Sequence, residues 1–535
     1  MLESATLWSL VEARARATPS ALMAVDARDR EIRFDEFRDH ALATARSLHA
    51  KGIGPGRTVS WMLPTRLESM LLIAALARLG VRQNPILPIY RRREVAFIVA
   101  QCQPDLLVTP AVWRGFDYPA MAREIAADCE GLETLVVDTD LPEDTAGPLP
   151  EPPGEATAEE PPIRWLFYTS GTTSAPKGVQ HTDASLWAAA RGMGRALDLR
   201  ASDRVAFVFP CTHIGGINWL QAGLAWGCAQ ILIENFADAS TIPALRRHGV
   251  TLAAAGTVFH EAYLEAQRRR AVGTKGPASE ASTATADGRP APLFPAVRAF
   301  PGGGAPKPPR LHRDLKRELG GVGILSGYGM TEAPILSMAR PDDPDEKLAK
   351  TEGRPVSAEV DLRVVRADGH LARPGEEGEF RVRAPQLFRG YVDSALDHDA
   401  FDEAGCFRTG DLGYLDEAGY VVVTGRLKDV IIRKGENIPA REIEDLLHEH
   451  PKVADVAVIG LPDPRTGERC CAVVVSSDVD DPLDMAEMAR FLRERGVMVQ
   501  KIPEQLESVD SIPRNATGKI LKHELRARHA RKAGD

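Results

Sequence analysis

Apolar side chains recur every three or four positions in three stretches before residue 102, the spacing of a helix that buries one face. These stretches are 37–48, 67–79 and 93–101. Short continuous apolar runs stand between them, at 59–63 and 105–108, and are typical of buried strands. Helices that alternate with buried strands predict an α/β architecture in layers, with largely parallel sheets.

The pattern changes near residue 425 and predicts a second, smaller unit. A helix near 442–447, apolar strands at 453–459 and 472–475, and a helix at 484–494 follow one another closely. A set of about a hundred residues is long enough to fold as its own α+β domain. We therefore expect a large N-terminal domain over residues 1–426 and a small C-terminal domain over residues 427–535.

Two stretches have almost nothing to bury. Residues 145–162 are rich in Pro, Glu, Gly and Ala, which predicts a surface linker. Residues 273–292 are rich in Ser, Thr, Ala and Gly, and we expect a mobile insertion without a function of its own.

Composition and charge narrow the class of protein. The chain has 535 residues, 44% hydrophobic and 26% charged, with a net charge of -9. This composition is that of a globular protein, and the acidic balance argues against a nucleic-acid binder, so we expect small-molecule partners. The seven cysteines show no C-x-x-C spacing, which favours a reducing, cytoplasmic environment. We see no signal peptide and no apolar run long enough to be a transmembrane segment.

The densest cluster of phosphate-binding chemistry follows the apolar strand Trp165–Phe167. It reads Tyr168-Thr169-Ser170-Gly171-Thr172-Thr173-Ser174-Ala175-Pro176-Lys177-Gly178-Val179. Hydroxyls, backbone N–H groups and a lysine can together wrap polyphosphate oxygens. The order of residues does not match a P-loop, where the lysine follows a glycine and precedes Ser or Thr. An ordinary polar loop is the alternative.

Three further motifs carry polar chemistry, and each has a plainer interpretation. Residues 326–332 (Ser-Gly-Tyr-Gly-Met-Thr-Glu) offer an aromatic face for a base and a carboxylate for Mg²⁺, although a turn at a strand end explains them equally well. Residues 407–411 place Asp411 after a glycine, suited to ribose hydroxyls or to a simple turn. Residues 512–519 end in Lys519, which can reach outward from the small domain or be an ordinary surface lysine.

Taken together and in this order, the motifs resemble those of the acyl-adenylate-forming (AMP-binding) superfamily, which includes acyl-CoA synthetases, peptide-synthetase adenylation domains and luciferases. The resemblance extends over nearly the whole chain. It implies a large N-terminal domain of layered α/β subdomains with a β-barrel-like part, and a small mobile α+β C-terminal domain.

The resemblance also implies roles for particular residues. The loop over the ATP phosphates would use the lysine and polar residues Thr169, Ser170, Gly171, Thr172, Thr173 and Lys177. The adenine and its surroundings would be held by Gly303, Gly304, Ala305, Pro306, Tyr328 and Gly329. Ribose contacts would come from Asp411 and Arg426. Thr331 would contact the α-phosphate, Glu332 would bind Mg²⁺, and Lys519 would bridge the substrate carboxylate and the α-phosphate.

Three more positions match the family in ways that concern the second substrate and the movement between steps. His213 corresponds to the gate beside the carboxylate, and Lys428 to the hinge of the small domain. Gly435 lies in the segment that would face the thiol channel after rotation about Lys428.

The implied reaction is an acyl-CoA ligase reaction. A carboxylic acid and ATP would form acyl-AMP and pyrophosphate with Mg²⁺, and coenzyme A would then take the acyl group and release AMP. We expect an apolar monocarboxylic acid: a medium- or long-chain fatty, alicyclic or aromatic one. Delivery of the acyl group to a carrier protein and a non-catalytic nucleotide-binding homologue are the alternatives, and the choice between monomer and homodimer is left open.

Overall fold

The structure is a computed structural model. It describes residues 1–4, 6–154, 161–169, 176–254, 256–271, 291–305, 307–433, 436–463, 467–515 and 518–530. Of the two low-complexity stretches, the one expected at 273–292 lies outside the described residues except for its last two. The described parts of 145–162 contain no helix or strand, as expected of a linker.

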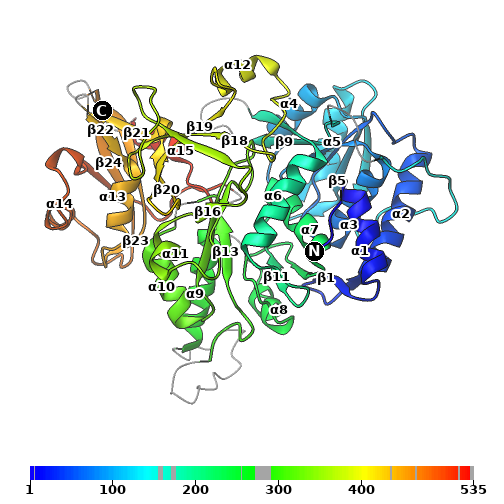
Figure 1. The fold of residues 1–535 in the computed structure, drawn as a ribbon, viewed down its shortest axis with the longest axis horizontal. Coiled ribbons are helices and arrows are strands. Elements are labelled where there is room, and N and C mark those ends of the chain that lie inside the picture. The colour runs from blue at the N-terminus through cyan, green and yellow to red at the C-terminus, as the bar shows by residue number, and fades with distance from the viewer. Residues whose placement is uncertain are drawn as a thin grey trace.

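A six-stranded sheet in the order β10-β9-β4-β3-β5-β8 forms the first layer of the large domain (Figure 1). Its strands are β3 (Thr58–Trp61), β4 (Arg82–Pro85), β5 (Leu106–Pro110), β8 (Glu133–Val137), β9 (Trp165–Thr169) and β10 (Lys177–His181). All neighbours are parallel except β9 and β10. The predicted largely parallel sheet is confirmed, and so are the three predicted strands within it, β3, β5 and β9.

The three helices predicted from apolar spacing are confirmed. They are α2 (Phe34–Ala50), α3 (Leu67–Leu79) and α4 (Arg92–Cys102). Helix α3 ends at Gly80, which adopts φ = 65°, a left-handed conformation that glycine enters without strain. Helix α5 (Tyr118–Ala127) packs against β5 and β8 of this sheet.

A second sheet, in the order β11-β12-β1-β2, lies beside the first. Its strands are β1 (Leu22–Asp26), β2 (Glu31–Arg33), β11 (Arg204–Phe207) and β12 (Ala229–Leu232). The helices α1 (Leu7–Ala17), α6 (Asp183–Ala196) and α7 (Ile214–Trp226) pack with it in one continuous apolar core that also includes the first sheet. Helix α7 is buried almost all round, so its first residue is held firmly in place.

The part of the large domain that faces the small domain contains two more sheets. Strands β13 (Phe300–Gly303), β14 (Ile324–Tyr328), β15 (Ser337–Met338) and β16 (Arg354–Pro355) form one of them. Four helices lie between residues 241 and 350 in the described part of the chain: α8 (Thr241–Arg247), α9 (Thr257–Ala271), α10 (Pro309–Glu318) and α11 (Asp345–Lys350). The other sheet is antiparallel throughout and contains β17 (Asp361–Val365), β18 (Gly378–Arg383), β19 (Phe407–Leu415) and β20 (Val421–Arg426).

The small domain follows β20 after a short turn, Leu427–Asp429. Its sheet contains β21 (Val430–Arg433), β22 (Glu436–Pro439), β23 (Val453–Asp463), β24 (Gly467–Ser476) and β25 (Gln505–Ser508). Helices α13 (Ala440–Leu447), α14 (Met485–Glu494) and α15 (Lys522–Ala530) pack around it. The predicted α+β character is confirmed, although β23 and β24 extend well beyond the predicted 453–459 and 472–475 because they pair with each other along a long hairpin.

Within the described part of the chain, no helix combines the length and the apolar character that crossing a bilayer requires.

Candidate active site

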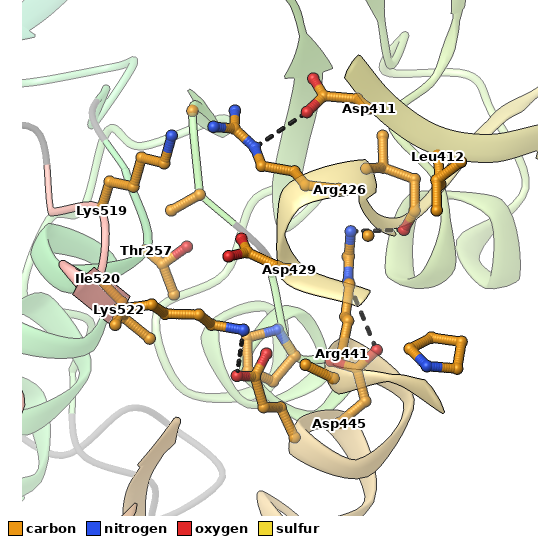
Figure 2. A pocket seen from close by; sticks show the side chains of 18 of the residues that line it. Thr257, Asp411, Leu412, Arg426, Asp429, Arg441, Asp445, Lys519, Ile520 and Lys522 are labelled. Carbon is orange, nitrogen blue, oxygen red and sulfur yellow. Dashed lines mark hydrogen bonds and ion pairs between the residues drawn. The ribbon is translucent and has the colours of Figure 1, made fainter. Parts of the chain in front are cut away.

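A cavity of about 170 Å³ lies between the two domains, and Figure 2 shows its lining. The large domain contributes glycines, an aromatic ring and charged groups, among them Gly304, Ala305, Tyr328, Gly329, Asp411 and Arg426. The small domain contributes mostly charged side chains, among them Asp429, Arg441, Asp445, Arg514, Lys519 and Lys522. Seven of the residues predicted from sequence therefore line one cavity, although they lie up to 215 positions apart (519 minus 304).

Asp411 is the best-held carboxylate of this cavity. Strands β19 and β20 pair so that Asp411 stands opposite Arg426, and Arg426 Nε lies 2.9 Å from Asp411 Oδ1. The Tyr328 hydroxyl donates to Asp411 Oδ2 over 3.0 Å. Asp411 is only 4% exposed, and two such partners hold the buried carboxylate in a fixed direction.

Glycines allow two strands to approach closely beside the Tyr328 ring. Gly303 and Gly327 are partners in the parallel pair β13–β14, and a Cβ atom on Gly303 would lie 2.6 Å from the Gly327 carbonyl oxygen. Gly304 has φ = 79° and would meet nothing within 4 Å. Backbone without side chains next to an aromatic face leaves a flat slot, the shape that suits a planar base. Pro306, predicted for the same role, lies outside the described residues.

Thr331 and Glu332 are fixed by contacts that the sequence did not reveal. His181, at the end of β10, is fully buried, and its Nε2 lies 2.8 Å from the Thr331 carbonyl oxygen. The Phe388 backbone N–H donates to the Glu332 carbonyl, and the Tyr391 hydroxyl donates to Glu332 Oε1 over 2.9 Å. Burial lowers the pKa of His181 to about 4, so His181 is neutral and donates to the carbonyl from Nε2.

Lys177 lies near Tyr391, the residue that is hydrogen-bonded to Glu332. It stands opposite Thr169 in the hairpin β9–β10, and its ammonium lies 4.9 Å from the centroid of the Tyr391 ring. Tyr391 thus contacts both the predicted phosphate-binding lysine and the predicted metal ligand Glu332. Ser170, Gly171, Thr172 and Thr173, between Thr169 and Lys177, lie outside the described residues.

His213 occupies the N-terminal cap of α7. Its Nδ1 accepts a hydrogen bond from the Gly215 backbone N–H over 3.1 Å, and burial lowers its pKa to about 4. The imidazole is therefore neutral, with its proton on Nε2. The described lining of the cavity does not include His213, so the structure gives it a fixed protonation state without placing it beside Lys519.

Lys519 points into the cavity toward Arg426 (Figure 2). Burial and the charge of Arg426 lower its pKa to about 8, against the opposing influence of Asp411, Asp429 and Glu332. Two cations from different domains thus face one cavity and repel each other. An anion bound between them would relieve that repulsion.

Two predicted positions remain. Lys428 lies in the turn Leu427–Asp429 that joins the domains, where a hinge would have to be. Gly435 lies outside the described residues.

Comparison with known proteins gives a clear family assignment. Residues 11–392 match the family "AMP-binding enzyme", and residues 442–519 match "AMP-binding enzyme C-terminal domain". The chain belongs to the AMP-binding enzyme family. The first range covers the motifs predicted to bind the phosphates, adenine and magnesium, and Lys519 is the last residue of the second range.

Relatives of this AMP-binding enzyme act on different acids. It is 30% identical to the medium-chain fatty-acid–CoA ligase of Escherichia coli, over 96% of this chain and 88% of the relative. It is 31% identical to the salicyl-AMP ligase / salicyl-S-ArCP synthetase of Mycobacterium tuberculosis, over 97% and 90%. The o-succinylbenzoate coenzyme A synthetase of Bacillus subtilis, in complex with ATP and a magnesium ion, has a TM-score of 0.80 and 27% identity, over 96% of this chain and 98% of that one.

Proposed function

We propose that this protein is an ATP-dependent, AMP-forming acyl-CoA ligase. It would activate a carboxylic acid as acyl-AMP, release pyrophosphate, and pass the acyl group to coenzyme A. The observation that carries the proposal is the convergence of Lys519 from the small domain with Tyr328, Asp411 and Arg426 of the large domain on one cavity. Relatives that are CoA ligases support the same reaction class.

The charges of the cavity fit the first half-reaction. A carboxylate that attacks an α-phosphate brings two anions together, so positive charge must be in place before they meet. In the proposal Lys519 supplies it at the carboxylate and Lys177 at the outer phosphates. Asp411 accepts hydrogen bonds from the ribose hydroxyls, and the Tyr328 ring packs against the base. The lowered pKa of Lys519 would rise again when the triphosphate binds.

The donor set also fits magnesium bound with ATP. Within the described part of the chain, Tyr391 is hydrogen-bonded to one oxygen of Glu332, which keeps the carboxylate oriented while its other oxygen is available to a hard cation. Bound there, Mg²⁺ would supply charge neutralisation for the phosphates. His181 and Tyr391 would act through position, by holding the backbone and side chain of this segment.

The acid is proposed to be an apolar monocarboxylic acid: a medium- or long-chain fatty, alicyclic or aromatic one. The segments proposed to form the wall of the acid site have small and apolar side chains and few charges; they are 211–219, 257–263, 300–304 and 327–332. The named acids of two relatives, a medium-chain fatty acid and salicylate, fall within this class.

Transfer to a carrier protein is the second candidate, because the Mycobacterium tuberculosis relative is a salicyl-S-ArCP synthetase. A panel of acids graded in chain length and ring content, read by pyrophosphate release, identifies the substrate. AMP production is then measured with and without coenzyme A. We expect AMP to form in proportion to acyl-CoA. A rate of AMP formation that is the same with and without coenzyme A would contradict the ligase assignment. Acylation of a phosphopantetheinyl carrier protein in place of coenzyme A would favour the second candidate.

A further inference from the structure

Arg441, the second residue of α13 in the small domain, reaches across to the large domain. Its Nη1 donates to the Val423 carbonyl oxygen of β20 over 2.5 Å, and its Nη2 lies 3.7 Å from Glu352 Oε1. Within the small domain, its Nε lies 3.6 Å from Asp445 Oδ2. The side chain of Arg441 is 14% exposed, and Figure 2 shows it between β20 and α13.

Glu352 is held from the opposite side by the strand that carries Tyr328. The Ser326 hydroxyl donates to Glu352 Oε2, and Ser326 lies two residues before Tyr328 on β14, on the same face of the strand. The Glu352 backbone N–H donates to the Val421 carbonyl over 2.8 Å, so the residue is also attached to β20. Both carboxylate oxygens are thus engaged, one by the nucleotide strand and one by the small domain.

The surroundings make this pair sensitive to the separation of the domains. Glu352 is 7% exposed, and the buried Lys307 ammonium, which donates to the Leu348 and Thr351 carbonyls, adds positive charge near it. Removal of either partner of a buried pair leaves the other charged and poorly solvated. Rotation of the small domain that withdraws Lys519 would also carry Arg441 away from Val423 and Glu352.

We propose that Glu352 and Arg441 are positioning residues that hold the small domain in the orientation that inserts Lys519, and that Ser326 connects this pair to the nucleotide-binding strand. The proposal rests on the proposed function for its kinetic consequence. Its structural part, the stabilisation of one domain orientation, does not depend on the identity of the acid. Glu352 and Arg441 both line the cavity, and in this proposal they act through Lys519 and β14.

The test compares Glu352→Gln, Arg441→Gln and the double variant in the two half-reactions. We expect acid-dependent ATP–pyrophosphate exchange to fall about tenfold in each single variant, with thioester formation from supplied acyl-AMP unchanged or faster. The double variant should lose little more than either single one, because the two residues form one interaction. Glu442→Gln is the matched control: Glu442 is the next residue of α13, and its ion pair with Lys501, at 2.5 Å, lies within the small domain.

A second readout follows the domain orientation without catalysis. Acetic anhydride labels amines, and Lys519 is half-buried in the cavity whereas Lys51 is exposed on the large domain. We expect the labelling rate of Lys519, relative to that of Lys51, to rise several-fold in Glu352→Gln and Arg441→Gln and to stay unchanged in Glu442→Gln.

The outcomes separate this inference from the proposed function. Equal losses in both half-reactions, additive effects in the double variant, or unchanged labelling of Lys519 would overturn the inference. If the wild-type protein exchanges pyrophosphate with no acid of the panel, the proposed function fails, and the labelling experiment still decides whether Glu352 and Arg441 hold the domains together.

Discussion

At the scale of single residues, the charged groups that line the cavity are not equally well paired. Asp411 has two partners, whereas Lys519 faces Arg426 and has a lowered pKa. The protonated ammonium of Lys519 is poorly stabilised until an anion binds. A functional role for Lys519 therefore explains its position better than a contribution to the stability of the fold. In the absence of an anion, protonation of Lys519 below about pH 8 disfavours its insertion.

The lowered pKa of Lys519 gives the first prediction at this scale. As pH rises through about 8, Lys519 in the free enzyme loses its proton, so kcat/KM for ATP in pyrophosphate exchange should fall. Lys519→Arg should move this decrease to higher pH, because a guanidinium stays protonated, and Lys519→Ala should lose exchange far more than it loses thioester formation from supplied acyl-AMP. A wild-type profile that stays flat up to pH 10 would contradict the assigned charge.

Sequence reasoning succeeded where the chemistry is concentrated in short stretches, and it missed what those stretches touch. Tyr328, Asp411 and Lys519 were identified because each lies in a motif with unusual glycine or hydroxyl content. His181 and Tyr391 carry no such signal: each is separated from the residue it holds by 59 positions or more, and only folding brings them together. The roles of all these site residues stay predictions, and the loop residues from Ser170 to Thr173, Pro306 and Gly435 lie outside the described residues.

At the scale of elements, the loop that carries Lys519 is a tight turn pressed against α9. The Asn515 backbone N–H donates to the Lys519 carbonyl, the Lys519 N–H donates to Asn515 Oδ1 over 2.9 Å, and Arg514 joins the Gly518 carbonyl to Asp455. Spacing alone predicted the helices well, because an apolar face has a period, but it could not predict this turn, whose shape depends on the neighbouring helix.

Gly518 is the residue that makes the contact possible. Its φ is 84°, and a Cβ atom there would lie 3.0 Å from Cγ2 of Val258 on α9. We expect Gly518→Ala to lower pyrophosphate exchange about tenfold while thioester formation from acyl-AMP is nearly unaffected, because the turn can no longer lie against α9. Gly496→Ala is the matched control, since Gly496 has φ = 76° and nothing within 4 Å. If both variants lose exchange equally, backbone strain rather than the contact with α9 explains the loss.

At the scale of the whole molecule, no apolar cluster of the described residues crosses from one domain to the other. Every buried member of the large-domain clusters precedes residue 422, and every member of the two small-domain clusters follows residue 430. The interface between them is instead rich in charged groups, as expected of surfaces that separate and rejoin. This division supports the proposed boundary at 426/427, which the change of pattern near residue 425 predicted.

The separate cores predict that residues 1–426 fold alone. We expect this fragment to unfold cooperatively on heating, to bind ATP more weakly than the full chain, and to show no pyrophosphate exchange, because Lys519 is absent. Circular dichroism against temperature and nucleotide titration test this. A fragment that remains unfolded would mean that the small domain is needed for the large domain's core, contrary to the clusters described above.

Arg426 is both the last residue of β20 and the partner of Asp411, and the joining turn begins at the next residue. All residues proposed to bind the nucleoside therefore precede the turn about which the small domain would rotate. Under the proposed function, the mixed anhydride made in the first step would remain bound to the large domain while the residues beyond 426 rotate. A reactive intermediate would thus be protected from hydrolysis while the small domain withdraws Lys519 and rotates to its second orientation.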